Sequence, residues 1–193
     1  MTLPFQFRMS RLAFKFMLYV VLEGNMARLN LTGVDEGLSV VVSSKLTGAD
    51  DPEIILDSIL KLFPDFTCGL PEKPIFPSSQ NDIIASQDVR LDVFLQALHK
   101  QSILDTSLDF MSANLDETGT VFHISRQAAM AGKVAFPLQG IEPLGGVITI
   151  EIDGQNLGDW LEAATWHNGR ENIPRRIGDE FTMDDSGEAV TWH

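Results

Sequence analysis

Apolar side chains recur along the chain with two periods, and each period predicts one kind of element. Alternating apolar and polar residues, or a run of β-branched residues, are typical of a strand, whereas apolar residues three and four positions apart are typical of a helix. Strands are predicted at residues 38–46, 66–70, 82–86, 120–125, 133–136 and 147–153. Helices are predicted at residues 52–63, 89–115, 126–131 and 157–164.

Local sequence signals predict where these helices begin and end. Asp51 is a typical N-cap residue, Pro52 suits the first helical position, and Pro64 ends the helix. The apolar stripe of the long helical stretch shifts near residues 99–102, which predicts a bend or two separate helices. Gly132 follows the short helix and is expected to end it.

The order of these elements predicts an α+β fold. Strands and helices do not alternate regularly, as they do in a doubly wound parallel sheet. We therefore predict a two-layer sandwich in which helices cover one face of a largely antiparallel sheet. This domain is expected to span residues 37–164. It would follow an N-terminal extension at 1–36 and precede a polar, acidic and loosely attached tail at 165–193.

The first 30 residues are basic and apolar, unlike the acidic remainder of the chain. Lys15 interrupts the apolar run, and the longest uncharged run, residues 16–22, is too short to span a bilayer. Three interpretations are open: an upstream extension with Met26 as the biological start, an amphipathic helix on the domain or on a membrane surface, and a weak signal peptide. We favour the first and expect a cytoplasmic protein without a membrane partner.

Charge and residue usage argue against several classes of site. The chain has 27 acidic residues against 14 lysines and arginines, and this net charge of −13 opposes non-specific binding to nucleic acids. Cys68 is the single cysteine, and the four histidines lack the spacing of a zinc site. Glycine-rich phosphate loops and the nucleophile motif of hydrolases are also absent from the sequence. We therefore predict no enzymatic activity, no cofactor and no metal site.

Hydrogen-bond donors concentrate in two segments, His99–Gln101 and Arg126–Lys133. Arg126 and Lys133 flank a short helix whose small residues let another backbone approach closely, which suits phosphate contacts. The alternative is that these two cations only neutralise nearby acidic residues. Asp105, in the long helical stretch, is expected to pair with Lys100 or Gln101 rather than to act in catalysis.

Five segments within residues 37–164 carry a family resemblance. They are DDPEIILDSILKLFPD (50–65), LHKQSILDTS (98–107), RQAAMAGKVAF (126–136), PLGGVITIEI (143–152) and GDWLEA (158–163). In this order they resemble an archaeal family labelled RNA-binding or exosome-subunit-like. The resemblance implies an archaeal, cytoplasmic protein with a fold like that of ribosomal protein L-five, the large-subunit protein that contacts the five-S RNA.

The same resemblance implies RNA binding without catalysis, with structured RNA as the partner. The family-like donors retained in this chain, and hence the predicted RNA-binding residues, are Lys100, Gln101, Arg126, Gln127 and Lys133. The cations would contact phosphate, and the two glutamines would position the backbone. The chain departs from the family at His99, Ser102 and Ser107–Leu108, where arginine is usual, and it therefore offers fewer cations to a phosphate.

Two further functions are open from the sequence. The first is a protein-interaction or assembly module, for example a homodimer, in which an exposed sheet face or edge binds a second copy or another protein. The second, ranked lower, is an enzyme that uses scattered carboxylates and His123 in a deep pocket. The RNA-binding hypothesis requires that its predicted donors gather on one face of an otherwise negative domain.

Overall fold

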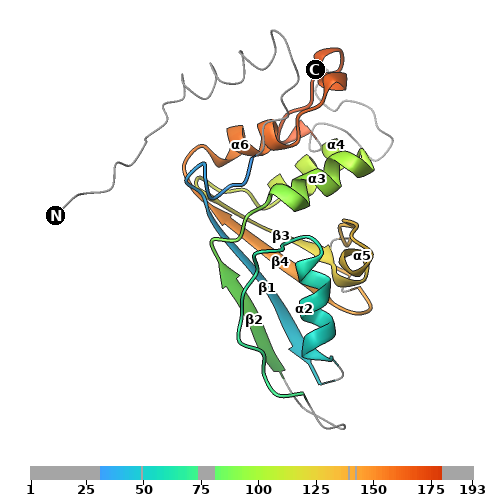
Figure 1. Ribbon diagram of the computed structural model, residues 1–193. Coiled ribbons are helices and arrows are strands. Elements are labelled where there is room, and N and C mark those ends of the chain that lie inside the picture. Colours follow the sequence, from blue (N-terminus) through green and yellow to red (C-terminus); the bar gives the residue numbers. More distant parts are fainter. Residues whose placement is uncertain (1–30, 49, 74–80, 139, 142, 180–193) are drawn as a thin grey trace, which may run out of the picture. The chain divides into compact units, whose positions relative to one another are not determined.

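The computed structural model describes residues 31–48, 50–73, 81–138, 140–141 and 143–179. Most of the predicted N-terminal extension, including Met26, and the last part of the predicted tail lie outside the described residues. The described chain forms a four-stranded antiparallel sheet with helices on one face (Figure 1). This arrangement confirms the predicted α+β class and the two-layer sandwich.

The sheet contains β1 (Ser39–Thr47), β2 (Asn81–Gln87), β3 (Gly119–Ser125) and β4 (Val147–Asp153), in the order β2-β1-β4-β3. Every neighbouring pair is antiparallel. In the middle of the sheet, Ser43 of β1 lies opposite Thr149 of β4, and Thr149 lies opposite His123 of β3. The first and last strands of the domain are therefore its two central strands, whereas β2 and β3 form the edges.

The helices are α2 (Pro52–Leu60), α3 (Asp92–Gln101), α4 (Leu104–Ser112), α5 (Arg126–Met130) and α6 (Leu157–Ala164), followed by the short 3-10 helix η1 (Asn168–Glu171). Asp51 caps α2 as predicted, because its carboxylate accepts the Glu53 N–H at 3.1 Å. The predicted interruption of the long helical stretch lies at Ser102, whose φ of 57° is left-handed and separates α3 from α4.

The core lies between the helices and one face of the sheet. Even-numbered residues of β1 and β4 are buried, whereas their odd-numbered neighbours are partly or fully exposed. Phe122 of β3 belongs to the buried set and stacks on Phe94 of α3, with ring centroids 6.0 Å apart. Phe94 in turn stacks on Phe63, which follows α2, at 5.7 Å. This column of aromatic rings fixes the helices against the even-numbered face.

Two of the predicted strands, at residues 66–70 and 133–136, are wrong. Thr67 donates its N–H to the hydroxyl of Ser86 at 3.2 Å rather than to a backbone carbonyl. Ala135 accepts the N–H of Ser125 at 2.9 Å, but no ladder continues from this bond in the described chain. A short apolar run does not reveal whether a partner strand is available, and here neither run has one.

The packed domain is longer than predicted at both ends. Leu31 and Thr32 are buried, and the Thr32 carbonyl accepts the Leu91 N–H at 2.9 Å. At the other end, Thr165 and Arg170 are buried although they belong to the predicted tail. The domain therefore includes residues 31–36 and 165–179 in addition to the predicted range of 37–164.

Candidate functional site

Arg126, a predicted phosphate contact, lies inside the domain. It opens α5, and only 5% of its surface is exposed. Its guanidinium donates to the carbonyl of Lys45 and to the carboxylate of Asp50, both at 3.1 Å, and also to the carbonyl of Gly145. Gly146 lies so close to this guanidinium that a Cβ there would overlap it. The guanidinium therefore joins the end of β1, the start of α2 and the loop before β4.

This placement corrects the sequence-based role of Arg126. A guanidinium that donates to one carboxylate and two carbonyls, and of which only 5% is exposed, is not presented to a phosphate at the surface. The physical reason is the neighbouring Asp50. This residue precedes α2, and its carboxylate supplies the counter-charge of the Arg126 guanidinium. The alternative stated above, that Arg126 neutralises a nearby acidic residue, describes the observed contact.

Gln101 also has a structural role. Its side-chain amide donates to the Val134 carbonyl at 2.9 Å and accepts the Val134 N–H at 2.7 Å. This two-bond contact attaches the chain after α5 to the end of α3. Because Lys100 and Lys133 each precede one partner of this contact, the two exposed lysines occupy neighbouring parts of the surface.

Gln127 is exposed on α5, and its side chain lies beside Gly145. It therefore borders the loop before β4. The five predicted RNA-binding residues do not form one exposed set: Arg126 is buried and Gln101 is engaged with Val134, so the exposed members are Lys100, Gln127 and Lys133.

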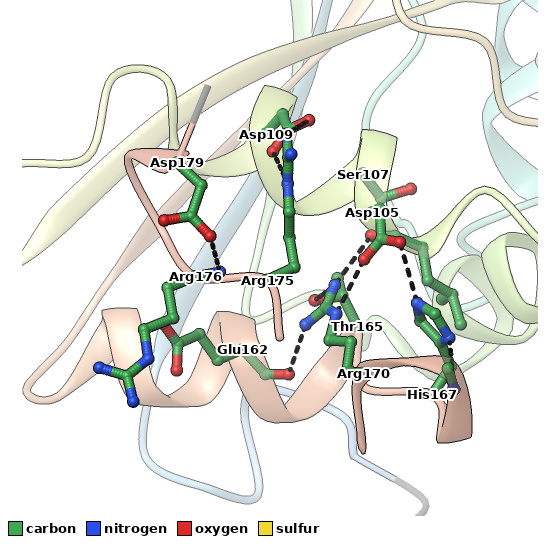
Figure 2. A network of polar contacts seen from close by, with 12 residues as sticks. Asp105, Ser107, Asp109, Glu162, Thr165, His167, Arg170, Arg175, Arg176 and Asp179 are labelled. Carbon is green, nitrogen blue, oxygen red and sulfur yellow. Dashed lines mark hydrogen bonds and ion pairs between the residues drawn. The ribbon is translucent and has the colours of Figure 1, made fainter. Parts of the chain in front are cut away.

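Asp105 is the centre of a polar network that the sequence did not reveal (Figure 2). Its carboxylate accepts the Arg170 Nε–H at 2.8 Å and lies 3.0 Å from the His167 Nε2 atom. The predicted pairing of Asp105 with Lys100 or Gln101 is therefore wrong, because its partners lie more than 60 residues away in the chain. Burial raises the pKa of Asp105, but the hydrogen bonds from Arg170 and His167 outweigh this effect and lower the pKa overall.

The Arg170 side chain is buried between α4 and α6. Besides Asp105, its guanidinium contacts the Leu104 carbonyl at 3.5 Å, the Glu162 carbonyl at 3.4 Å and the Thr165 hydroxyl at 3.3 Å. These acceptors belong to the start of α4 and the end of α6, so one side chain joins the two helices. An arginine in a segment that is otherwise polar gives no sequence signal of burial, because its partners are distant in the chain.

His167 is paired with a carboxylate but is not arranged as a general base. Its Nδ1 atom accepts the Gly169 N–H at 3.2 Å, so the neutral ring carries its proton on Nε2 and donates it to Asp105. No lone pair is left for a substrate in this arrangement. Within the described part of the chain, no three His, Cys, Asp or Glu side chains converge as metal ligands. No helix in that part is long and apolar enough to cross a membrane.

No described helix covers the odd-numbered face of the sheet (Figure 1). From this point we call it the open sheet face. It consists of residues 39, 41, 43, 45 and 47 of β1, 81, 83, 85 and 87 of β2, 119, 121, 123 and 125 of β3, and 147, 149, 151 and 153 of β4. Ile83 is 70% exposed and Val121 is 38% exposed on it.

The side chains in the middle of the open sheet face are small or weakly polar. Its central row contains Ala85, Ser43, Thr149 and His123, and the His123 Nδ1 atom lies 3.1 Å from the Thr149 hydroxyl. Lys45 lies two residues beyond this row on β1, and Glu151 lies two residues beyond it in the opposite direction on β4. The face therefore has a nearly uncharged centre, with the positive Lys45 on one side and the negative Glu151 and Asp153 on the other.

Comparison with known proteins identifies relatives that this chain matches over most of their length. A UPF0201 protein of Sulfurisphaera tokodaii is 30% identical over 132 residues, which are 65% of this chain and 88% of the relative. A UPF0201 protein of Methanothermobacter thermautotrophicus is 23% identical over 125 residues, or 63% of this chain and 89% of the relative. No family model matches the sequence.

A solved structure agrees with the fold. The crystal structure of an uncharacterized UPF0201 protein superposes with a TM-score of 0.53 and 18% sequence identity. The match covers 64% of this chain and 90% of the solved one. At this identity the comparison supports the two-layer arrangement alone. Because this chain covers 88% of the Sulfurisphaera relative at 30% identity, it belongs to the archaeal UPF0201 family.

Proposed function

We propose that this protein is a non-catalytic assembly module whose open sheet face binds a second copy of the chain. The observation that supports the proposal is the exposure of Ile83 and Val121 on a sheet face that no described element covers. A two-layer sandwich normally leaves one sheet face in water, and that face is then mostly polar. Branched apolar side chains that are left in water on such a face favour burial against another surface.

The pattern of charges favours a second copy as the occupant. Lys45 and Glu151 lie on opposite sides of the row that contains Ser43 and Thr149. A two-fold axis that lies between two copies and crosses this row obliquely exchanges the two positions, so that Lys45 of each copy faces Glu151 of the other. The small side chains of the central row let the two sheets approach closely.

The composition of the open sheet face argues against a nucleic acid as its occupant. Sheet faces that bind single-stranded RNA carry aromatic side chains on which bases stack. The open sheet face has no Phe, Tyr or Trp at its odd-numbered strand positions, and its formal charges are those of Lys45, Glu151 and Asp153. Neither base stacking nor attraction of phosphate is supported by this surface.

A matched pair of substitutions tests the proposal. Ile83 and Ile54 are both exposed isoleucines, at 70% and 53%, but Ile83 lies on the open sheet face and Ile54 lies on α2. We expect Ile83→Arg to raise the dimer dissociation constant at least about tenfold, which corresponds to about 1.4 kcal/mol. Ile54→Arg should leave the constant unchanged. Equal effects of the two substitutions in sedimentation velocity experiments would argue against the open sheet face.

RNA binding is the second candidate, and one observation favours it. The contact between Gln101 and Val134 brings the exposed Lys100 and Lys133 to neighbouring positions on the surface. The family resemblance described above is its other support. Two lysines on a chain of charge −13 are a small electrostatic footprint, which is why we rank this candidate below assembly. Fluorescence anisotropy with a structured RNA at several salt concentrations separates the two candidates.

A further inference from the structure

Residues 171–179, which begin with the last residue of η1, lie against α4 and α6 through a few polar contacts (Figure 2). Arg175 donates to both carboxylate oxygens of Asp109 on α4, at 2.6 and 3.3 Å. The Ile177 N–H lies 3.4 Å from the Glu162 carboxylate on α6, and the Ile177 side chain packs beside Gly158 of the same helix. The segment therefore bridges two helices whose facing side chains are acidic.

This segment is held differently from the residues before it. Arg170 is almost fully buried and contacts a carboxylate, two carbonyls and a hydroxyl, so the chain up to Arg170 is firmly packed. By contrast, residues 171–174 are exposed, and Ile173 is 78% exposed. The Arg175 side chain is 22% exposed and that of Asp109 is 26% exposed, so water and salt reach their ion pair.

An ion pair of this kind is geometrically specific but weak. A bidentate guanidinium–carboxylate contact fixes direction and register. A pair that solvent reaches contributes little to stability, because desolvation is incomplete and salt screens the attraction. Segments with few buried apolar contacts open locally at a much lower free energy than the whole domain unfolds. Residues 171–179 have few buried apolar contacts and a solvent-exposed ion pair, so they can open locally. The buried Arg170 would stay in place when they do.

Opening of the segment would expose a defined surface. The carboxylates of Asp109 and Glu162 would lose their partners, and the flat side of α6 at Gly158 would become accessible. This surface suits a segment that carries a guanidinium next to an aliphatic side chain, because Arg175 and Ile177 supply those groups in the closed arrangement. We propose that residues 171–179 are a releasable strap, which occupies in cis a site for an arginine-bearing segment of a partner protein.

The proposal predicts that the strap and an added peptide of the same sequence compete for the site on α4 and α6. A strap on the same chain has a high effective concentration, so it outcompetes an identical peptide added in solution. Removing the Arg175 guanidinium weakens the strap but leaves the site on α4 and α6 intact. The peptide should then bind in its place. This inference goes beyond the open sheet face and does not depend on it, because the strap lies against α4 and α6 in the helical layer.

The test uses the full chain and a labelled synthetic peptide with the sequence of residues 171–179. We expect Arg175→Ala to bind this peptide about threefold to fivefold more tightly than the unmodified chain does, because a pair that solvent reaches contributes up to about 1 kcal/mol. Arg90→Ala is the matched control, since Arg90 forms a partly exposed pair with Asp35 elsewhere on the domain. A peptide in which alanine replaces Arg175 should bind more weakly by a similar factor. Equal peptide affinities for Arg175→Ala and Arg90→Ala would overturn the proposal.

Hydrogen exchange on the unmodified chain provides a second test that needs no variant. The amides of residues 171–179 should exchange faster than those of α4 and α6, and the difference should grow as salt is added. Exchange of this segment at the same rate as α4 and α6 would show that it opens only with the whole domain, which contradicts a releasable strap.

Discussion

Arg126 and Asp50 form an ion pair of 3.1 Å although 76 residues separate them in the chain. Only 5% of the Arg126 side chain and 16% of the Asp50 side chain are exposed. The pair lies where β1 ends, α2 begins and the loop before β4 returns, so it joins three parts of the domain. A side chain that sequence patterns assign to RNA binding thus acts in the packing of the fold.

Removal of Asp50 should therefore destabilise the domain. Asp50→Ala leaves a buried guanidinium without its counter-charge, and the expected loss is about 3 kcal/mol of unfolding free energy. Asp57→Ala is the control, because Asp57 is exposed on α2 and its loss should change stability by less than about 0.5 kcal/mol. Urea denaturation measures both values, and similar losses for the two variants would contradict the role of the pair.

The open sheet face makes a prediction about charge. Lys45→Glu should weaken dimerisation, because the carboxylate introduced at this position in each copy would face Glu151 of the other copy across the proposed two-fold axis. The double variant Lys45→Glu, Glu151→Lys restores opposite charges and should recover most of the lost affinity. The dissociation constants can be compared by sedimentation velocity. A double variant that is as weak as Lys45→Glu alone would exclude this pairing of the two copies.

The exposed lysines provide the corresponding test of RNA binding. Assembly through the open sheet face predicts no affinity for structured RNA that depends on Lys100 or Lys133. The RNA candidate predicts instead that Lys100→Ala and Lys133→Ala each weaken binding and each reduce the slope of log affinity against log salt by about 1. Anisotropy titrations of the two variants and the unmodified chain distinguish these outcomes.

Asp105 makes a prediction about acid stability. Its folded-state pKa lies below the ordinary value of 3.8, so the folded chain holds this proton less tightly than the unfolded chain does. The stabilisation is therefore complete above the ordinary pKa and is lost as pH falls below about 3.8 through the lowered value. Asp105→Asn should reduce stability at neutral pH and flatten its decline in acid. Denaturant titrations between neutral pH and about pH 3 provide the measurement, and an unchanged acid slope would contradict this role of Asp105.

The sequence predicted elements whose causes are local. The span of α6, residues 157–164, was predicted from apolar spacing, and the cap of α2 from the Asp51-Pro52 pair. The separation of α3 from α4 at Ser102 follows from a shift of the apolar stripe. Each of these signals operates within a few residues, so no knowledge of the tertiary fold is needed to recognise it.

The contacts of individual polar side chains could not be predicted in the same way. Asp105 has possible partners within its own helical stretch, yet it pairs with Arg170, which lies 65 residues away. Arg126 and Lys133 are equally cationic in sequence, but one is buried and the other exposed. Charge and spacing do not predict which cationic side chain is buried, because burial depends on long-range packing. The open sheet face follows from the predicted class, whereas its apolar residues were visible only once the register of the strands was known.

The mass of the full chain in solution tests the central claim most directly. Sedimentation equilibrium over protein concentrations from about 1 to about 100 µM spans the range of a moderately stable dimer. Assembly through the open sheet face predicts a mass that approaches twice 21.3 kDa as concentration rises, and a return to the single-chain mass in Ile83→Arg. A mass of 21.3 kDa at every concentration would contradict it.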